Sequence, residues 1–271
     1  MEIGAQLYSV RSYLDTFERM DETFARLKQM GYGCVQLSGH PEKGERGAGF
    51  NVEEINRLID KHELPVRLTH VSSMRLENDL DRVIADHKAI GCSNIGIGEI
   101  PGAFNEDFAL DEKNIKAFIN RYESIANKIA DAGLKFFYHN HHFDFCKMEN
   151  GKVIIDYLLA ECPHFNFTLD THWIQRGGAS ITQYIKKMQG KVECVHLKDF
   201  LLSSKKTARC NRLEPMFMPV GEGVLDWKSI LKEYANSGTK YAFVEQDDAV
   251  DYDNPFSQLE ISINNLKKIG Y

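Results

Sequence analysis

Three histidines and an asparagine follow an apolar segment near the middle of the chain, at 134–145 (LKFFYHNHHFDF). The segment begins as an apolar run typical of a buried strand, and its polar residues start where such a strand would leave the core. Imidazole rings in that position can bind a metal ion or transfer protons near neutral pH. His139 and His141 share one side of an extended strand, and Asn140 faces the other. Any single histidine here could instead be hydrogen-bonded at the surface, so the interpretation depends on the cluster.

Polar or titratable side chains also end most of the other segments that we predict as strands. In a parallel barrel these carboxyl ends share one face, where the active sites of such barrels lie. This pattern favours an enzyme over a non-catalytic sugar-binding or scaffold protein. The residues concerned are Gln6, Tyr8, Gln36, Ser38, His70, His139, His141, Asp170, His172, His196, Lys198 and Glu245.

The last three predicted strands end close to Asp170, His196 and Glu245. Two carboxylates and one imidazole on neighbouring strands are a mixed oxygen and nitrogen donor set that suits Mn²⁺, Co²⁺, Zn²⁺, Fe²⁺ or Mg²⁺. Each residue also has a structural interpretation. Asp170 could cap the following helix, His196 could be a hydrogen-bonded core histidine, and Glu245 could pair with Lys198.

Strand-like and helical segments alternate along the whole chain. The strands are expected at 3–9, 34–38, 66–71, 94–98, from 134, 165–170, 194–198 and 241–245. Helical periodicity is found at 16–30, after Asn51 (a capping box with Glu54), at 80–90 and 114–132, around 181–188, after Asp226 and after Asn254, with Pro255 at the first helical position.

Eight strands alternating with helices predict a single (β/α)₈ barrel domain over residues 1–271. The main alternative is a doubly wound open sheet, which usually carries a glycine-rich phosphate loop after its first strand. The segment after Ser9 (VRSYLD) contains no such loop.

Composition narrows the class of protein. The 271 residues carry a net charge of −6, which argues against a nucleic-acid-binding protein. No apolar run approaches the ~20 residues that span a membrane, and the first residues do not have the pattern of a signal peptide. Six cysteines without Cys-x-x-Cys spacing are expected to be free thiols, which suggests a cytoplasmic location.

The chain resembles the xylose-isomerase-like sugar phosphate isomerase/epimerase superfamily of TIM barrels, which includes inosose dehydratases, ketose 3-epimerases and hydroxypyruvate isomerases. The resemblance extends from IGAQLYSVR near the start to FVEQD at 243–247. Its most specific parts are VHLKDF at 195–200 and PVGEGVLDW at 219–227.

The resemblance implies one divalent metal ion held by Glu, Asp, His and Glu from strands five to eight. In this chain the corresponding residues are His139, Asp170, His196 and Glu245. The first is a departure, because an imidazole stands where many relatives have a carboxylate. The metal could be Mn²⁺, Zn²⁺, Co²⁺, Mg²⁺ or Fe²⁺.

The activity implied by the resemblance is isomerisation or epimerisation of a small sugar or keto-sugar, by proton transfer at a carbon next to a metal-polarised carbonyl. Glu245 would be one base. A ligated His139 is not free to be the other, so His141, His172 and Lys198 are the candidates for the second group. Lys198 could instead form only an ion pair.

Other reactions and partners remain open at this stage. Loss of one base makes a lyase or dehydratase acting on a keto-sugar or keto-glycoside the main alternative. A metal-dependent nuclease and a non-catalytic sugar-binding barrel are less well supported. We expect no nucleic-acid or membrane partner, and leave open whether the chain forms a homo-oligomer.

Substrate contacts are expected from the same barrel face. Gln6, Gln36 and His70 end the first three strands, and Glu222 lies between two glycines that let the backbone approach a ligand. Such glycines can also simply form a turn. The basic segment 203–212 (SSKKTARCNR) is either a lid over the substrate or a solvated loop.

Overall fold

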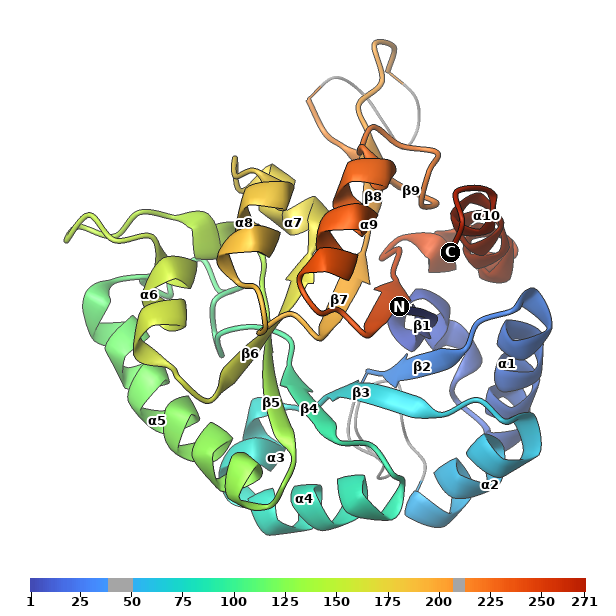
Figure 1. The fold of residues 1–271 in the computed structure, drawn as a ribbon, viewed down its shortest axis with the longest axis horizontal. Helices are drawn as coiled ribbons and strands as arrows, with labels where there is room; N and C mark the ends of the chain where they lie inside the picture. The colour runs from blue at the N-terminus through green and yellow to red at the C-terminus, as the bar shows by residue number, and fades with distance from the viewer. Residues whose placement is uncertain (39–50, 207–212) are drawn as a thin grey trace.

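The computed structural model describes residues 1–38, 51–206 and 213–271, and in it eight parallel strands close into a barrel (Figure 1). Around the barrel the strand order is β1-β10-β7-β6-β5-β4-β3-β2. The expected (β/α)₈ barrel is therefore confirmed. The barrel strands are β1 (Glu2–Gln6), β2 (Cys34–Leu37), β3 (Val66–His70), β4 (Asn94–Ile97), β5 (Lys135–His139), β6 (Phe165–Asp170), β7 (Cys194–Leu197) and β10 (Tyr241–Val244).

Helices form an outer layer around these strands (Figure 1). Their apolar faces pack on the barrel and make one continuous core with it. The helices are α1 (Phe17–Met30), α2 (Val52–His62), α3 (Ser73–Asn78), α4 (Leu80–Ala89), α5 (Glu112–Asp131), α6 (Ile154–Glu161), α7 (Thr171–Arg176), α8 (Ile181–Lys187), α9 (Trp227–Asn236) and α10 (Pro255–Lys268).

Strand register brings the carboxyl ends of β5, β6, β7 and β10 to one level. His139 pairs with Thr168, and Asp170 pairs with His196. Val244 pairs with the residue that follows His196, so Glu245 lies just beyond the same level. The polar ends of four neighbouring strands therefore meet at one mouth of the barrel.

Several element boundaries differ from the sequence expectation. The first strand ends at Gln6, because the Gln6 side chain accepts a hydrogen bond from the Tyr8 N–H and the chain turns into a 3₁₀ helix, η1 (Leu7–Tyr13). The prediction that strand one extends to Ser9 is therefore wrong. The short helices α3, α6 and α7 were not expected, since each has at most eight residues and too few turns to show a clear period.

Expected helix caps are mostly confirmed. Asn51 and Glu54 form the capping box of α2, and Asp226 accepts a hydrogen bond from the Ser229 N–H at the start of α9. Pro255 opens α10. Asn254 is the N-cap residue of α10, although its side chain makes no capping hydrogen bond.

The long connection after β7 contains a hairpin that the sequence pattern did not reveal. Strands β8 (Asp199–Leu201) and β9 (Met216–Met218) pair antiparallel, and the hairpin projects from the barrel (Figure 1). The basic segment 203–212 falls in this connection, and its part from 207 to 212 lies outside the described residues. A role for that segment as a lid stays a prediction.

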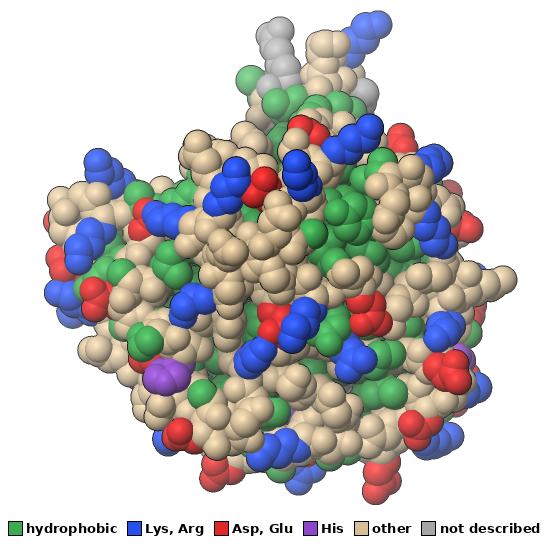
Figure 2. All heavy atoms as spheres, viewed as in Figure 1, with side chains coloured by type: hydrophobic (Ala, Val, Ile, Leu, Met, Phe, Trp, Pro, Cys, Tyr) green, Lys and Arg blue, Asp and Glu red, His purple; other side chains and the backbone are tan. Residues whose placement is uncertain are grey.

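Surface features agree with a mixed-charge globular chain. On the face shown in Figure 2, Lys and Arg side chains alternate with Asp and Glu. No helix in the described parts of the chain is both long and apolar enough to cross a membrane. Five cysteines are free thiols as expected, and Cys210 lies outside the described residues.

The buried carboxylate of Asp199, in β8, holds the connection between β9 and α9 in place. It accepts hydrogen bonds from the backbone N–H groups of Gly221 (3.0 Å) and Gly223 (3.1 Å) and from the Trp227 indole N–H (2.6 Å). A Cβ atom on Gly223 would lie 2.1 Å from Asp199 Oδ1, so only glycine allows this close approach. One carboxylate thus fixes the path from β9 to α9.

We expect Asp199→Ala to lower the free energy of unfolding by about 3–5 kcal/mol, because the buried Trp227 indole and two partly buried backbone N–H groups lose a charged acceptor. Urea unfolding followed by circular dichroism measures this loss. The matched control is Asp226→Ala, which removes an exposed helix cap and is expected to cost only about 1 kcal/mol. Equal effects of the two substitutions would contradict the role of Asp199.

Candidate metal centre

Four side chains from neighbouring strands converge at the barrel mouth. His139 ends β5, Asp170 ends β6, His196 lies in β7 and Glu245 follows β10. Each offers one ligand atom, and the four atoms lie within 4.8 Å of one another. All four residues are buried, the most exposed being Glu245 at 6%. The structure thus brings together the four residues that the family resemblance pointed to.

The ligand atoms of this cluster are His139 Nε2, Asp170 Oδ2, His196 Nδ1 and Glu245 Oε2, and none makes a hydrogen bond of regular geometry with the described residues. They do make close ionic contacts: His196 Nδ1 lies 2.7 Å from Glu245 Oε2, and Lys198 lies beside both carboxylates. Buried polar atoms are nearly always hydrogen-bonded, so four such atoms facing one point call for a ligand. A divalent cation satisfies all of them at once.

The other polar atom of three of these residues is held by the protein. His139 Nδ1 donates to the Gly98 carbonyl (3.0 Å), and His196 Nε2 donates to Gln36 Oε1 (2.7 Å). Asp170 Oδ1 accepts from the Trp173 N–H (3.1 Å). Ligand imidazoles in metalloproteins are oriented in this way by their second nitrogen. The cap interpretation of Asp170 and the metal interpretation therefore hold together, each on its own oxygen.

The residues present fit a divalent metal ion. Two imidazoles and two carboxylates form a donor set suited to Zn²⁺, Mn²⁺, Fe²⁺ or Co²⁺, and the second histidine makes it richer in nitrogen than a set with three carboxylates. The shortest contact between these side chains joins His196 Nδ1 and Glu245 Oε2 at 2.7 Å.

Lys198 places a buried ammonium group beside the cluster. Its Nζ lies 3.1 Å from Asp170 Oδ2, 3.2 Å from Glu245 Oε2 and 3.0 Å from Asp247 Oδ1. Burial would lower the pKa of Lys198, but these carboxylates outweigh it and raise the pKa above its usual value. The ion-pair interpretation of Lys198 is confirmed, and a charged ammonium can donate a proton or a hydrogen bond but cannot act as a base.

Electrostatics keep the carboxylates ionised. Burial would raise the pKa of Glu245, but Lys198 and His196 outweigh it and lower that pKa. Asp170 behaves in the same way: burial opposes ionisation, yet Lys198 and the neighbouring histidines hold its pKa well below the usual value. The pKa of His196 is raised against the effect of burial, mainly by Glu245. The pocket therefore attracts positive charge.

His141 lies next to the cluster with its ring centroid 4.7 Å from that of His139. Burial lowers the pKa of His141 well below its usual value, so the ring is neutral. Its backbone N–H donates to Asp144 Oδ2 (2.7 Å), and Tyr138 Oη donates to Asp144 Oδ1 (2.7 Å). Asp144 therefore fixes the turn from β5 into the 3₁₀ helix η2 (His142–Phe145).

The remaining candidates surround this group at different positions. The His70 ring lies 5.2 Å from His139 and 5.4 Å from His196. His172 lies on α7 and packs against Phe200 and Phe217 of the hairpin, and burial lowers its pKa to about 3. His172 is therefore placed among aromatic rings, outside the four-residue cluster.

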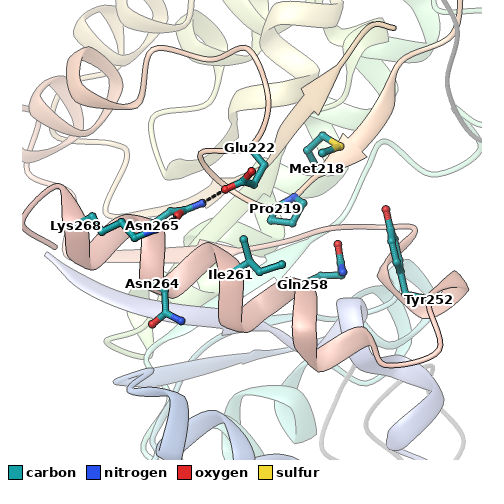
Figure 3. Close-up of a pocket in the computed structure, with 9 residues that line it drawn as sticks. All are labelled: Met218, Pro219, Glu222, Tyr252, Gln258, Ile261, Asn264, Asn265 and Lys268. Atoms are coloured by element: carbon teal, nitrogen blue, oxygen red, sulfur yellow. Dashed lines mark hydrogen bonds between the residues drawn. The ribbon is translucent and has the colours of Figure 1, made fainter. Parts of the chain in front are cut away.

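The other three residues that were predicted to contact the substrate lie in different environments. Gln36 orients His196, as described above. Gln6 Oε1 accepts hydrogen bonds from the Tyr8 N–H and from Ser38 Oγ (2.7 Å) at the end of β1. Glu222 instead accepts a hydrogen bond from Asn265 on α10 (2.7 Å) and lines a pocket on the outer surface of that helix (Figure 3). The structure does not bring Glu222 together with the cluster.

Two residues of the site were missed from the sequence. Asp247, two positions after Glu245, contacts Lys198, and a period of two along an extended segment could have indicated it. Asp144 was missed because its role depends on how the chain turns after β5, which brings its carboxylate to Tyr138 Oη and to the His141 N–H.

Comparison with known proteins agrees with the barrel fold. The family model for the xylose isomerase-like TIM barrel matches residues 24–269. A search of curated proteins found no match.

Solved structures share the fold at low sequence identity. A sugar phosphate isomerase/epimerase from Parabacteroides distasonis has a TM-score of 0.77 at 17% identity, covering 98% of this chain and 93% of the other. A 3-keto-D-glucoside 4-epimerase from E. coli has a TM-score of 0.70 at 13% identity, covering 99% and 98%. A probable 3-DHS dehydratase from Bacillus anthracis has a TM-score of 0.69 at 16% identity, covering 98% and 99%.

We expect His139→Ala to reduce bound metal by roughly tenfold or more after loading with Mn²⁺ or Zn²⁺, because one of four ligands is lost. Gln36→Leu should weaken binding by about 10–100-fold through loss of orientation of His196. Elemental analysis of the dialysed protein measures both. His172→Ala is the matched control, and equal metal content in all variants would refute the site.

Burial raises the pKa of Asp144 from 3.8 to about 7. A carboxyl whose pKa is higher in the folded than in the unfolded state stabilises the fold at low pH. This contribution is lost as the pH rises from about 4 to about 7. Compared with Asp144→Asn, the wild type should therefore lose on the order of 2–4 kcal/mol of stability between pH 4 and pH 7.5. Urea unfolding at both pH values measures the difference.

The control for this pH effect is Asp226→Asn. Hydrogen bonds from Ser229 lower the pKa of Asp226, so the wild type should gain stability over this variant as pH rises. A pH-independent difference for Asp144→Asn would show that its carboxyl titrates normally.

Proposed function

Because this chain belongs to the xylose isomerase-like TIM barrel family, we propose that it is a divalent-metal-dependent isomerase or epimerase of a small sugar or keto-sugar. The observation that carries the proposal is the buried cluster of two imidazoles and two carboxylates with four unsatisfied ligand atoms. The sugar epimerases among the structural neighbours support the same reaction class.

His139, Asp170, His196 and Glu245 would hold the metal ion. When bound, the ion would polarise a substrate carbonyl and the adjacent hydroxyl, which makes the proton on the carbon between them more acidic. The surrounding protein excludes water, since three of these residues are at most 4% exposed. The protein residues then determine where that proton moves.

Glu245 is the proposed base. Its lowered pKa keeps it ionised, and its position after β10 gives it the largest exposed fraction of the four at the mouth. His139 cannot share this role, because Nδ1 is hydrogen-bonded to Gly98 and Nε2 points into the cluster. The chain therefore has one carboxylate base where a symmetric two-base site would have two.

His141 and Lys198 are the proposed groups for the second proton. The neutral His141 ring can accept a proton beside the substrate and return it. The Lys198 ammonium can stabilise the negative charge that develops on a substrate oxygen, because it is charged and buried. Lys198 would act by its charge and His141 by proton exchange.

A lyase or dehydratase is the second candidate function. It is favoured by the imidazole of His139 in place of a carboxylate, since elimination needs one base and one acid. Glu245 would remove the proton next to the carbonyl, and the Lys198 ammonium would supply a proton to the departing hydroxyl or alkoxide. A dehydratase occurs among the structural neighbours.

We expect Glu245→Gln to reduce exchange of the substrate α-proton with solvent by at least about 10²-fold, because general-base catalysis contributes ~10²–10⁴-fold. Incubation in D₂O with a panel of keto-sugars, followed by NMR, measures the exchange. The matched control is Glu193→Gln, which changes an ion pair with Lys135 and Lys240 just before β7, at the opposite end of the barrel.

The same experiment separates the two candidate reactions. Deuterium in an isomeric product indicates isomerisation or epimerisation, and loss of water or an aglycone indicates elimination. Undiminished exchange by Glu245→Gln would contradict the role of Glu245 as the base.

A further inference from the structure

An exposed phenylalanine lies against the candidate proton-transfer histidine. Phe104 is 61% exposed and belongs to the connection between β4 and α5, on the same barrel face as the cluster. Its ring meets His141 edge-on, with centroids 4.8 Å apart and an interplanar angle of 83°. Single exposed apolar residues are common, but this one contacts the site directly.

Phe104 is the exposed end of an aromatic cluster whose other rings, those of His141, Phe143 and Trp173, are buried. His141 and Phe143 stack with their planes 16° apart, and Phe104 meets the Phe143 ring at 5.3 Å and 85°. Trp173 lies beside His141, with the ring centroids 5.2 Å apart. The part of the Phe104 ring that these neighbours leave exposed offers a site for a further aromatic ring.

The loop holds Phe104 in a defined place. Backbone bonds close successive turns, from Ala103 N to Ile100 O (3.0 Å) and from Asn105 N to Gly102 O (2.8 Å). Ile100 is buried in the core at one side of these turns. The exposed ring is thus presented by an ordered segment, which reduces the entropy lost on binding.

Charge next to Phe104 indicates which ligands fit. The two acidic residues that follow shortly after it, Glu106 and Asp107, are exposed. They disfavour a phosphate or carboxylate at this position, because like charges repel. The exposed Phe104 ring therefore suits a neutral planar group.

We propose that the exposed ring of Phe104, supported by the buried rings of His141, Phe143 and Trp173, forms a stacking subsite for a neutral aromatic substituent attached to the sugar substrate. The His141 ring lies between His139 and Phe104, with its centroid 4.7 Å from that of His139 and 4.8 Å from that of Phe104. A sugar held at the cluster would therefore place its substituent over Phe104. This inference rests on the proposed function and makes aryl glycosides or their keto derivatives the preferred substrate class.

The test is a binding comparison on the Mn²⁺-loaded protein by isothermal titration calorimetry. The probes are 4-nitrophenyl β-D-glucopyranoside and methyl β-D-glucopyranoside, which differ only in the aryl group. We expect the aryl probe to bind about five- to tenfold more tightly, as one aromatic contact allows. Phe104→Ala should remove this ratio, and Phe104→Trp should keep it.

Ile261→Ala is the matched control, since Ile261 is an exposed apolar residue on α10 that lines the outer pocket of Figure 3. Equal binding of the two probes, no binding of the aryl probe, or a preference that survives Phe104→Ala would overturn the subsite. Because the ratio is measured without turnover, these outcomes leave the metal and proton-transfer proposal standing. Failure of that proposal would show instead as absent metal or undiminished proton exchange by Glu245→Gln.

Discussion

Burial of negative charge is the constraint on which the barrel mouth depends. Asp170 and Glu245 are almost entirely removed from water, and Asp247 lies beside them. Buried carboxylates are strongly destabilising unless they are paired or coordinated. Lys198 contacts all three but supplies only one positive charge. A divalent cation at the cluster would neutralise the remaining charge, so the electrostatics and the unsatisfied ligand atoms lead to the same conclusion.

Three of the four candidate ligand side chains are held by the fold through one atom, and a second atom of each faces the cluster. Asp170 caps α7 with one oxygen, and the imidazoles of His139 and His196 are fixed by Gly98 and Gln36. The same contacts that end a strand or start a helix thus orient the ligand atoms. This explains why a structural and a catalytic interpretation of these residues need not exclude each other.

Much of the fold and of the cluster could be predicted from the sequence. Strands such as Phe165–Asp170 are short apolar runs that end in polar residues, and register in a parallel barrel aligns those ends. Glu222 could not be placed, because its partner Asn265 comes from a helix 43 positions later. The helices α6 and α7 were missed because short, mostly buried helices show little polar periodicity.

The sequence by itself determined the fold class and the candidate site residues, since period, strand ends and donor types are local properties. The histidines at 139 and 141 were identified in this way, whereas the departure from a carboxylate at the first ligand position followed from the family resemblance. Only the tertiary structure decided which nitrogen of His139 faces the cluster, that Lys198 remains charged, and that Asp144 fixes the turn carrying His141. The first two depend on contacts between segments far apart in the chain, and the third on how the chain turns after β5. The pKa of a buried group is set by such surroundings.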